Sequence, residues 1–127
     1  MLPKHWLFGD VEEKRPVGLL PRTPCGCAIA AIAFQGSLYM LKELARTSNR
    51  EEVRKHLKEV VIPNQEDFNK ICLEPKGLRV VGARDILEWD LRKKDWRERV
   101  RKEADLLIFR IQNTLSECLE KEVIRGK

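Results

Sequence analysis

The sequence predicts an all-α protein: a small helical bundle with a Pro-rich extended N-terminal arm and one long C-terminal helix. Three observations predict this fold. Four of the six prolines lie within residues 1–26, no proline follows Pro75, and no glycine lies between Gly82 and Gly126. A chain of 127 residues supports one domain with an arm rather than two independent cores.

Residues 1–26 are predicted to form the arm, and residues 27–127 the helical domain. Proline fixes φ and removes a backbone donor, so the arm cannot form a long helix. A free linker would not need the large apolar side chains that this arm carries. They include Trp6, Phe8, Leu19 and Leu20. We therefore expect the arm to lie against an apolar surface, either its own core or a neighbouring subunit.

The first helix is expected to begin near Cys25 and to run to about Arg46. Residues 23–41 carry no charge and are almost long enough to cross a bilayer, but several alanines, Gln35 and Gly36 keep their hydropathy modest. A helix that is apolar all round is also typical of the centre of a small bundle. We favour the buried helix, and a membrane span stays as the alternative.

Two shorter helices are expected in the middle of the chain. Ser48 and Glu51 match a capping box at the start of the first, which is expected to end at Pro63. Its apolar stripe consists of Val53, Leu57, Val60 and Val61. Asn64 is expected to cap the second, whose apolar face consists of Phe68, Ile71 and Cys72. Residues 78–81 are expected to be extended chain.

From Ala83 the chain is expected to be helical almost to its end, with a break near Lys94 as an alternative. Apolar residues recur every three or four positions, the period of a straight helix. They are Trp96, Val100, Ala104, Leu107, Ile111, Leu115 and Cys118. Trp89 precedes Trp96 by seven residues, and both are expected to anchor the core.

The helix from Asp95 to Val123 would be about 44 Å long, more than its shorter partners can cover. We therefore expect part of it to contact another copy of the chain or a related helical subunit. The predicted subunit contacts are Trp6, Phe8, Leu19 and Leu20 of the arm together with Leu107, Ile111 and Leu115.

Positive charge is concentrated in residues 92–102. This segment holds seven basic and two acidic residues, and its net charge equals the +5 of the whole chain. Basic side chains at helical spacing can reach successive phosphates. The predicted nucleic-acid-binding residues are Arg92, Lys93, Lys94, Arg97, Arg99, Arg101 and Lys102. Acid–base pairs such as Asp95–Arg99 leave a solvated helix face as an alternative, and an acidic protein or lipid partner as another.

The cysteines match no common site. Cys25 and Cys27 are spaced differently from a zinc or redox CxxC motif. Cys72 and Cys118 are expected to be buried thiols, with a disulfide or a metal site as alternatives. A Cys–His nucleophile pair with His5 or His56 shows no third orienting group. The chain has no P-loop, GxGxxG or HExxH motif either, so we expect no enzyme activity, no cofactor and no bound metal.

These patterns favour a self-assembling helical protein that binds nucleic-acid phosphates without base specificity, DNA more readily than RNA. No base-reading motif is present. The layout and the basic helix are similar to those of the helical coat proteins of filamentous archaeal viruses, and this architectural similarity implies a coat or packaging protein. Charged residues from Lys4 onward interrupt any signal peptide, so we expect an intracellular or virion protein. The alternative function is a small accessory subunit of a larger protein complex, associated with a membrane through residues 23–41.

Overall fold

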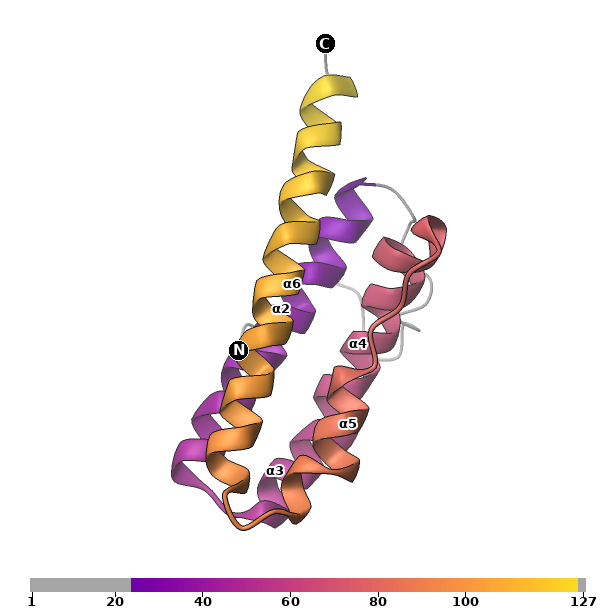
Figure 1. The fold of residues 1–127 in the computed structure, drawn as a ribbon. Coiled ribbons are helices and arrows are strands. Elements are labelled where there is room, and N and C mark those ends of the chain that lie inside the picture. Colours follow the sequence, from indigo (N-terminus) through magenta and orange to yellow (C-terminus); the bar gives the residue numbers. More distant parts are fainter. Residues whose placement is uncertain (1–23, 126–127) are drawn as a thin grey trace.

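The computed structural model describes residues 24–125 and is all-α over that range. The two longest helices, α2 (Pro24–Thr47) and α6 (Trp96–Arg125), lie side by side along the molecule (Figure 1). The elements between them are α3 (Arg50–His56), the π-helical turn η2 (Leu57–Val61), α4 (Ile62–Phe68), the π-helical turn η3 (Asn69–Leu73), the 3-10 turn η4 (Glu74–Lys76), α5 (Gly82–Glu88) and the 3-10 turn η5 (Asp90–Arg92). The predicted bundle and its long last helix are confirmed.

Helix α2 begins at Pro24, so residues 24–26 of the predicted arm belong to the bundle. The rest of the arm, residues 1–23, lies outside the described residues. One face of α2 is buried and consists of Cys27, Ala30, Ala31, Phe34, Leu38, Leu41 and Ala45. Its other face leaves Ile32 and Tyr39 about half exposed. None of the helices within residues 24–125 combines the length and the apolar character that a membrane span requires.

The prediction that Pro63 ends a helix is wrong, because the chain continues through it as one curved rod. Proline cannot donate to the carbonyl four residues earlier, and its ring clashes with that group. Just before Pro63 the helix widens into the turn η2, in which the Ile62 N–H donates to the Leu57 carbonyl. In such a π turn the hydrogen bonds span five residues instead of four. Pro63 then falls in the first turn of α4, where its missing N–H is tolerated.

Two predicted caps also differ in the structure. The Asn49 side chain, not Ser48, accepts the Glu52 N–H at 2.9 Å and caps α3. Asn64 caps no helix; its side-chain amide donates to the Val60 carbonyl at 2.9 Å, at the turn where proline supplies no donor.

Residues 78–81 form neither helix nor strand, but Val81 is not extended as predicted, because it has a ψ of 10° where it precedes α5. Buried amide side chains take the place of a strand partner. The Asn69 side chain accepts the Val80 N–H at 2.8 Å and donates to the Val80 carbonyl at 2.9 Å. One turn earlier, Gln65 accepts the Ala83 N–H at 2.8 Å. Both amides are fully buried. Replacing either side chain would therefore leave a buried backbone group without its hydrogen bond, which costs free energy. These bonds fix the segment beside α4.

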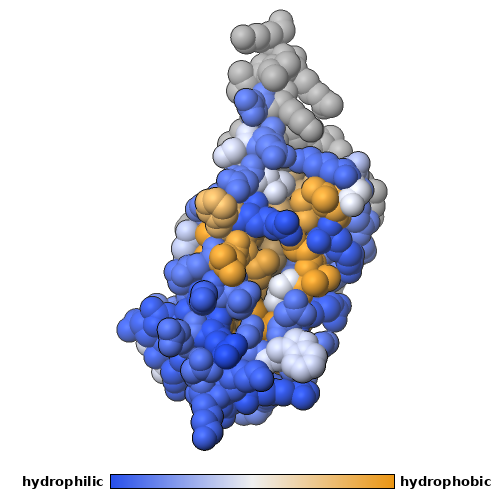
Figure 2. Space-filling model, in the orientation of Figure 1, coloured by the Kyte–Doolittle hydropathy of each residue, from blue (hydrophilic) through white to orange (hydrophobic). Residues whose placement is uncertain are grey.

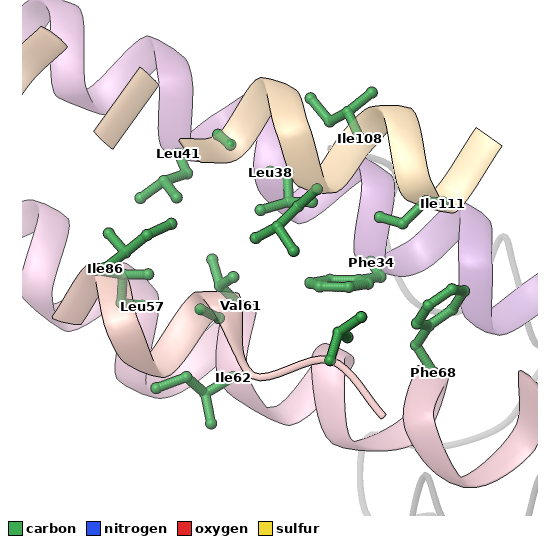
Figure 3. Packing of buried hydrophobic residues seen from close by; sticks show 14 of the residues in the cluster. Phe34, Leu38, Leu41, Leu57, Val61, Ile62, Phe68, Ile86, Ile108 and Ile111 are labelled. Atoms are coloured by element: carbon green, nitrogen blue, oxygen red, sulfur yellow. The ribbon is translucent and has the colours of Figure 1, made fainter. Parts of the chain in front are cut away.

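A single apolar core joins all these elements (Figure 3). The rings of Phe34 and Phe68 are in contact in a tilted arrangement, with centroids 5.4 Å apart and an interplanar angle of 46°. Ile108 and Ile111 of α6 close the core on one side. Complete burial of one such side chain contributes about 1.5–3 kcal/mol, so the core dominates the stability of the bundle.

Cys27 and Cys72 form a disulfide between the start of α2 and η3, with Cα atoms 5.1 Å apart. Cys72 is buried, as expected, but it is not a free thiol. The structure therefore corrects the prediction in favour of its disulfide alternative. Phe68, Ile71 and Cys72 share a buried face, also as expected.

The break expected as an alternative near Lys94 is present. Helix α5 ends at Glu88, and Lys93 adopts extended backbone before α6 begins. This break destroys the helical phase between the two tryptophans, so Trp96 is buried whereas Trp89 is 61% exposed. The prediction that Trp89 anchors the core is wrong for that reason.

Candidate nucleic-acid interface

The predicted basic segment lies at one end of the bundle, where the chain passes from η5 through residues 93–95 into α6. Figure 2 shows the hydrophilic side chains gathered over this end. Arg50, at the start of α3, holds the connection in place from more than 40 residues away in the sequence. Its Nε donates to the Leu91 carbonyl and its Nη2 to the Lys93 carbonyl, each at 2.9 Å. Two bonds from one planar guanidinium fix the path of this connection.

Trp96 and Arg97 join the start of α6 to the end of α2. The Arg97 guanidinium lies over the Trp96 ring, 4.5 Å from its centroid, and that of Arg50 lies 5.6 Å from the same centroid. Arg97 Nη1 also donates to the Ala45 carbonyl at 3.0 Å, in the last turn of α2. Carbonyls there lack helical partners and attract a cation. Arg97 therefore serves the fold, although its position in the basic segment was predicted for phosphate binding.

Arg99 is paired within its own helix, as the spacing predicts. Its Nε donates to Asp95 Oδ1 at 2.7 Å. This hydrogen bond lowers the pKa of the Asp95 carboxyl and raises the pKa of the Arg99 guanidinium. Burial raises the pKa of the Asp90 carboxyl at the same end of the bundle. Both partners of the Arg99 pair are exposed, so the pair adds little stability, but it neutralises one of the seven cations.

The other five predicted phosphate-binding side chains are exposed and form no hydrogen bond or ion pair with any described residue. They are Arg92, Lys93, Lys94, Arg101 and Lys102. Lys93 lies on extended backbone before α6, so it does not share a helix with Arg97 and Arg101, although all three are four residues apart in the sequence. The free cations instead lie on a fixed connection and on the first two turns of the following helix.

The predicted subunit contacts on α6 need correction. Leu107 is 8% and Ile111 0% exposed, so both belong to the core of their own chain, and Leu115 is partly buried against it. These residues lie on the inward face of α6, and α2 and α5 of the same chain cover that face. The large apolar side chains that α6 exposes are Leu106 and Phe109. The predicted contacts Trp6, Phe8, Leu19 and Leu20 lie outside the described residues.

The cysteines and histidine described here have structural partners. The sulfur of Cys27 is bonded to Cys72. His56 Nε2 lies 2.9 Å from the Ser37 carbonyl, and burial lowers the pKa of the imidazole. The neutral ring therefore donates this bond near neutral pH. Among residues 24–125, no cluster of His, Cys, Asp and Glu side chains has the membership to hold a metal ion.

Comparisons with protein-family models, with curated proteins and with solved structures found no match to this chain. The candidate site therefore stands on its geometry. Sequence reasoning located its seven cations but missed Arg50, which organises the segment. No local pattern could have identified Arg50, because its acceptors are carbonyls far away in the sequence.

Proposed function

We propose that this protein binds nucleic-acid phosphates without base specificity through the basic end of the bundle, and that it self-assembles, as a coat or packaging protein does. One observation carries the proposal: Arg92, Lys93, Lys94, Arg101 and Lys102 are exposed, unpaired with described residues, and placed on backbone that Arg50 and Arg97 hold. Residues 92–102 carry a net charge of +5 even with Asp95 and Glu98 included, and a surface with this excess of positive charge attracts a polyanion.

Two further features support phosphate contact without base reading. No helix of the described bundle presents a base-reading motif. Trp89 exposes a flat ring beside this end, where the Arg92 N–H donates to the Trp89 carbonyl at 3.2 Å. In a single-stranded nucleic acid or at a frayed end, bases of any sequence can stack on such a ring.

The assembly part is supported by helix α6. It is 30 residues long, about 45 Å, and its last turns extend beyond the other described elements (Figure 1). A helix end that extends past the other described elements is a natural contact for a second subunit.

The salt dependence of binding tests the phosphate part. Affinity for duplex DNA of random sequence should fall on a log–log plot with a slope between about −3 and −5, because each phosphate contact contributes about −0.9. The affinities for two unrelated DNA sequences should agree within about threefold. A protein that reads bases would lose more affinity than this at each mismatched base pair. A flat response to salt would contradict the proposal. A monomeric mass by light scattering, with and without DNA, would contradict the assembly part.

The second candidate function is a small accessory subunit of a larger protein complex. The exposed apolar side chains of Leu78, Leu106 and Phe109 favour it, because apolar patches of this kind are typical of protein contacts. Replacing Arg92, Lys93 and Lys94 with glutamine separates the two candidates. It should weaken retention on nucleic acid under the first and leave co-purification with the partner unchanged under the second.

A further inference from the structure

A groove lies between the middle of α6 and the chain that follows η3. It encloses about 460 Å³. Three of its apolar side chains are mostly exposed: Leu78 at 55%, Leu106 at 56% and Phe109 at 64%. Figure 2 shows apolar side chains gathered over the middle of this face, away from the hydrophilic end. Leaving such a surface in water costs free energy, so the groove is suited to an apolar segment.

The groove is preformed rather than a loose gap. One wall includes Leu78 and Arg79, and the buried Asn69 amide fixes the next residue, Val80, by two hydrogen bonds. The other wall is the uninterrupted helix α6. A segment that binds here therefore meets a rigid surface, and little ordering of the groove opposes its binding.

Charges at the rim limit what fits. Lys76 pairs with Glu117 at 2.7 Å, and Arg79 pairs with Glu66 at 2.9 Å. Arg110, in contrast, is exposed and forms no ion pair with any described residue. An apolar segment followed by carboxylates would satisfy both the apolar walls and this cation.

Helix α2, which follows the N-terminal arm in the chain, begins near this groove. Helix α2 begins at Pro24, and Cys27 is bonded to Cys72, whose neighbour Leu73 lines the groove. The 23 residues before Pro24 can span up to about 75 Å when extended. The arm is therefore long enough to pass along the groove and return to α2.

The arm holds two apolar clusters, and charge distinguishes them. The cluster Trp6-Leu7-Phe8 is followed by three carboxylates, Asp10, Glu12 and Glu13. The cluster at residues 17–20 is flanked instead by basic residues, Lys14, Arg15 and Arg22. Only the first cluster complements a groove whose unpaired rim charge is positive.

We propose that residues 6–13 of the same chain dock in this groove, with Trp6 and Phe8 against its apolar walls and the carboxylates facing Arg110. This contact goes beyond the proposed function. It assigns the arm an intramolecular site at the middle of α6, remote from the basic end. The docked arm would cover the apolar side chains that α6 and residues 78–81 leave exposed.

Photo-crosslinking in the full chain tests this contact. p-Benzoylphenylalanine replaces Phe109, and after irradiation the product is digested and sequenced by mass spectrometry. We expect a product with the mass of one chain, joined to a peptide within residues 6–13. The same probe at Tyr39, exposed on α2, should give no arm product. A product with the mass of two chains would overturn the proposal in favour of a second copy, and absence of any product with residues 6–13 would overturn it outright.

A charge exchange tests the pairing with Arg110. Glu12→Lys with Glu13→Lys should lower the yield of the crosslink about fivefold, the upper range for an exposed ion pair. Adding Arg110→Glu should restore the yield. The matched control, Lys14→Glu with Arg15→Glu, alters the same number of charges outside the docked segment and should not lower the yield. A yield that does not respond to the change at Glu12 and Glu13 would overturn the pairing.

Discussion

The first turns and the middle turns of α6 present different surfaces to solvent. Just before the helix and in its first two turns, five cations are unpaired with described residues, while Arg50 and Arg97 fix the backbone that carries them. In the middle, Leu106 and Phe109 are exposed and the neighbouring cations Lys76 and Arg79 are paired with carboxylates. The two surfaces therefore differ in how many cations stay unpaired with described residues: five at the basic end, against Arg110 alone among the described residues that line the groove.

The Cys27–Cys72 disulfide stabilises the groove region more than the basic end. Replacing both cysteines with alanine should lower the free energy of unfolding by about 4 kcal/mol, because the bond closes a loop across 45 residues. Urea denaturation measures this loss, and hydrogen exchange should show faster opening at residues 73–81 than at residues 91–99. Identical denaturation midpoints for the native chain with and without reductant would contradict the disulfide.

Leu107 and Leu106 are adjacent in α6 but belong to different surfaces. Leu107→Ala should destabilise the single chain by about 3 kcal/mol, because it leaves a cavity in the core. Leu106→Ala should change the stability by less than about 0.5 kcal/mol, since that side chain is mostly exposed. Thermal or urea unfolding at low concentration distinguishes them. Equal effects would contradict the inward orientation of Leu107.

Arg50 is expected to hold the backbone of the basic end in place, although it is not one of the five unpaired cations there. Arg50→Gln should cost about 1–2 kcal/mol, because it removes two charge-assisted bonds at a partly exposed site. Amides of residues 91–95 should exchange faster, and affinity for DNA should fall. Arg54→Gln, which breaks an exposed pair with Glu51 on α3, is the matched control and should change the stability by less than about 0.5 kcal/mol. Unchanged exchange in Arg50→Gln would show that the segment needs no such support.

Acid should weaken the bundle through His56. Burial lowers the pKa of this imidazole in the folded chain below its ordinary value of 6.5, so the unfolded chain binds more protons between the two values. The stability that depends on the neutral, buried His56 ring is fully present above pH 6.5. It is lost as the pH falls through 6.5 towards the pKa of His56 in the folded chain. Urea midpoints at pH 7.5 and 5.5 should therefore differ less in His56→Gln than in the native chain. A native midpoint that rises on acidification would contradict the burial of a neutral ring.

Apolar spacing was sufficient to predict α2, the length of α6 and the apolar stripe along α6. It did not show what the stripe contacts, because Leu107, Ile111 and Leu115 were predicted as subunit contacts and pack in or against the core of their own chain. The path through Pro63 was not predictable, because a π turn depends on where the following helix must pack rather than on a local pattern. The exposure of Trp89 followed from a break between η5 and α6 that seven-residue spacing cannot reveal.

The sequence was sufficient to predict that basic residues cluster at the candidate site. It did not show which of them support the fold and which are left unpaired. Arg97 and Lys102 look equivalent in the sequence, yet Arg97 binds the Ala45 carbonyl whereas Lys102 is unpaired with any described residue. Which cations remain free depends on acceptors that only the folded chain brings near. The disulfide between Cys27 and Cys72 has the same origin, since it joins residues 45 positions apart.

The difference in salt dependence between two matched variants tests the role of the basic end most directly. One variant replaces Arg92, Lys93 and Lys94 with glutamine, and the other replaces Lys55, Lys58 and Lys70, which are also exposed and lie outside both the basic segment and the groove. The first should reduce the slope of log affinity for DNA against log salt by about 2–3, because three phosphate contacts are lost. The second should change the slope by less than about 0.5, because it removes the same charge without removing contacts. Equal slopes in the two variants would show that DNA responds only to net charge and would contradict a binding surface at the basic end.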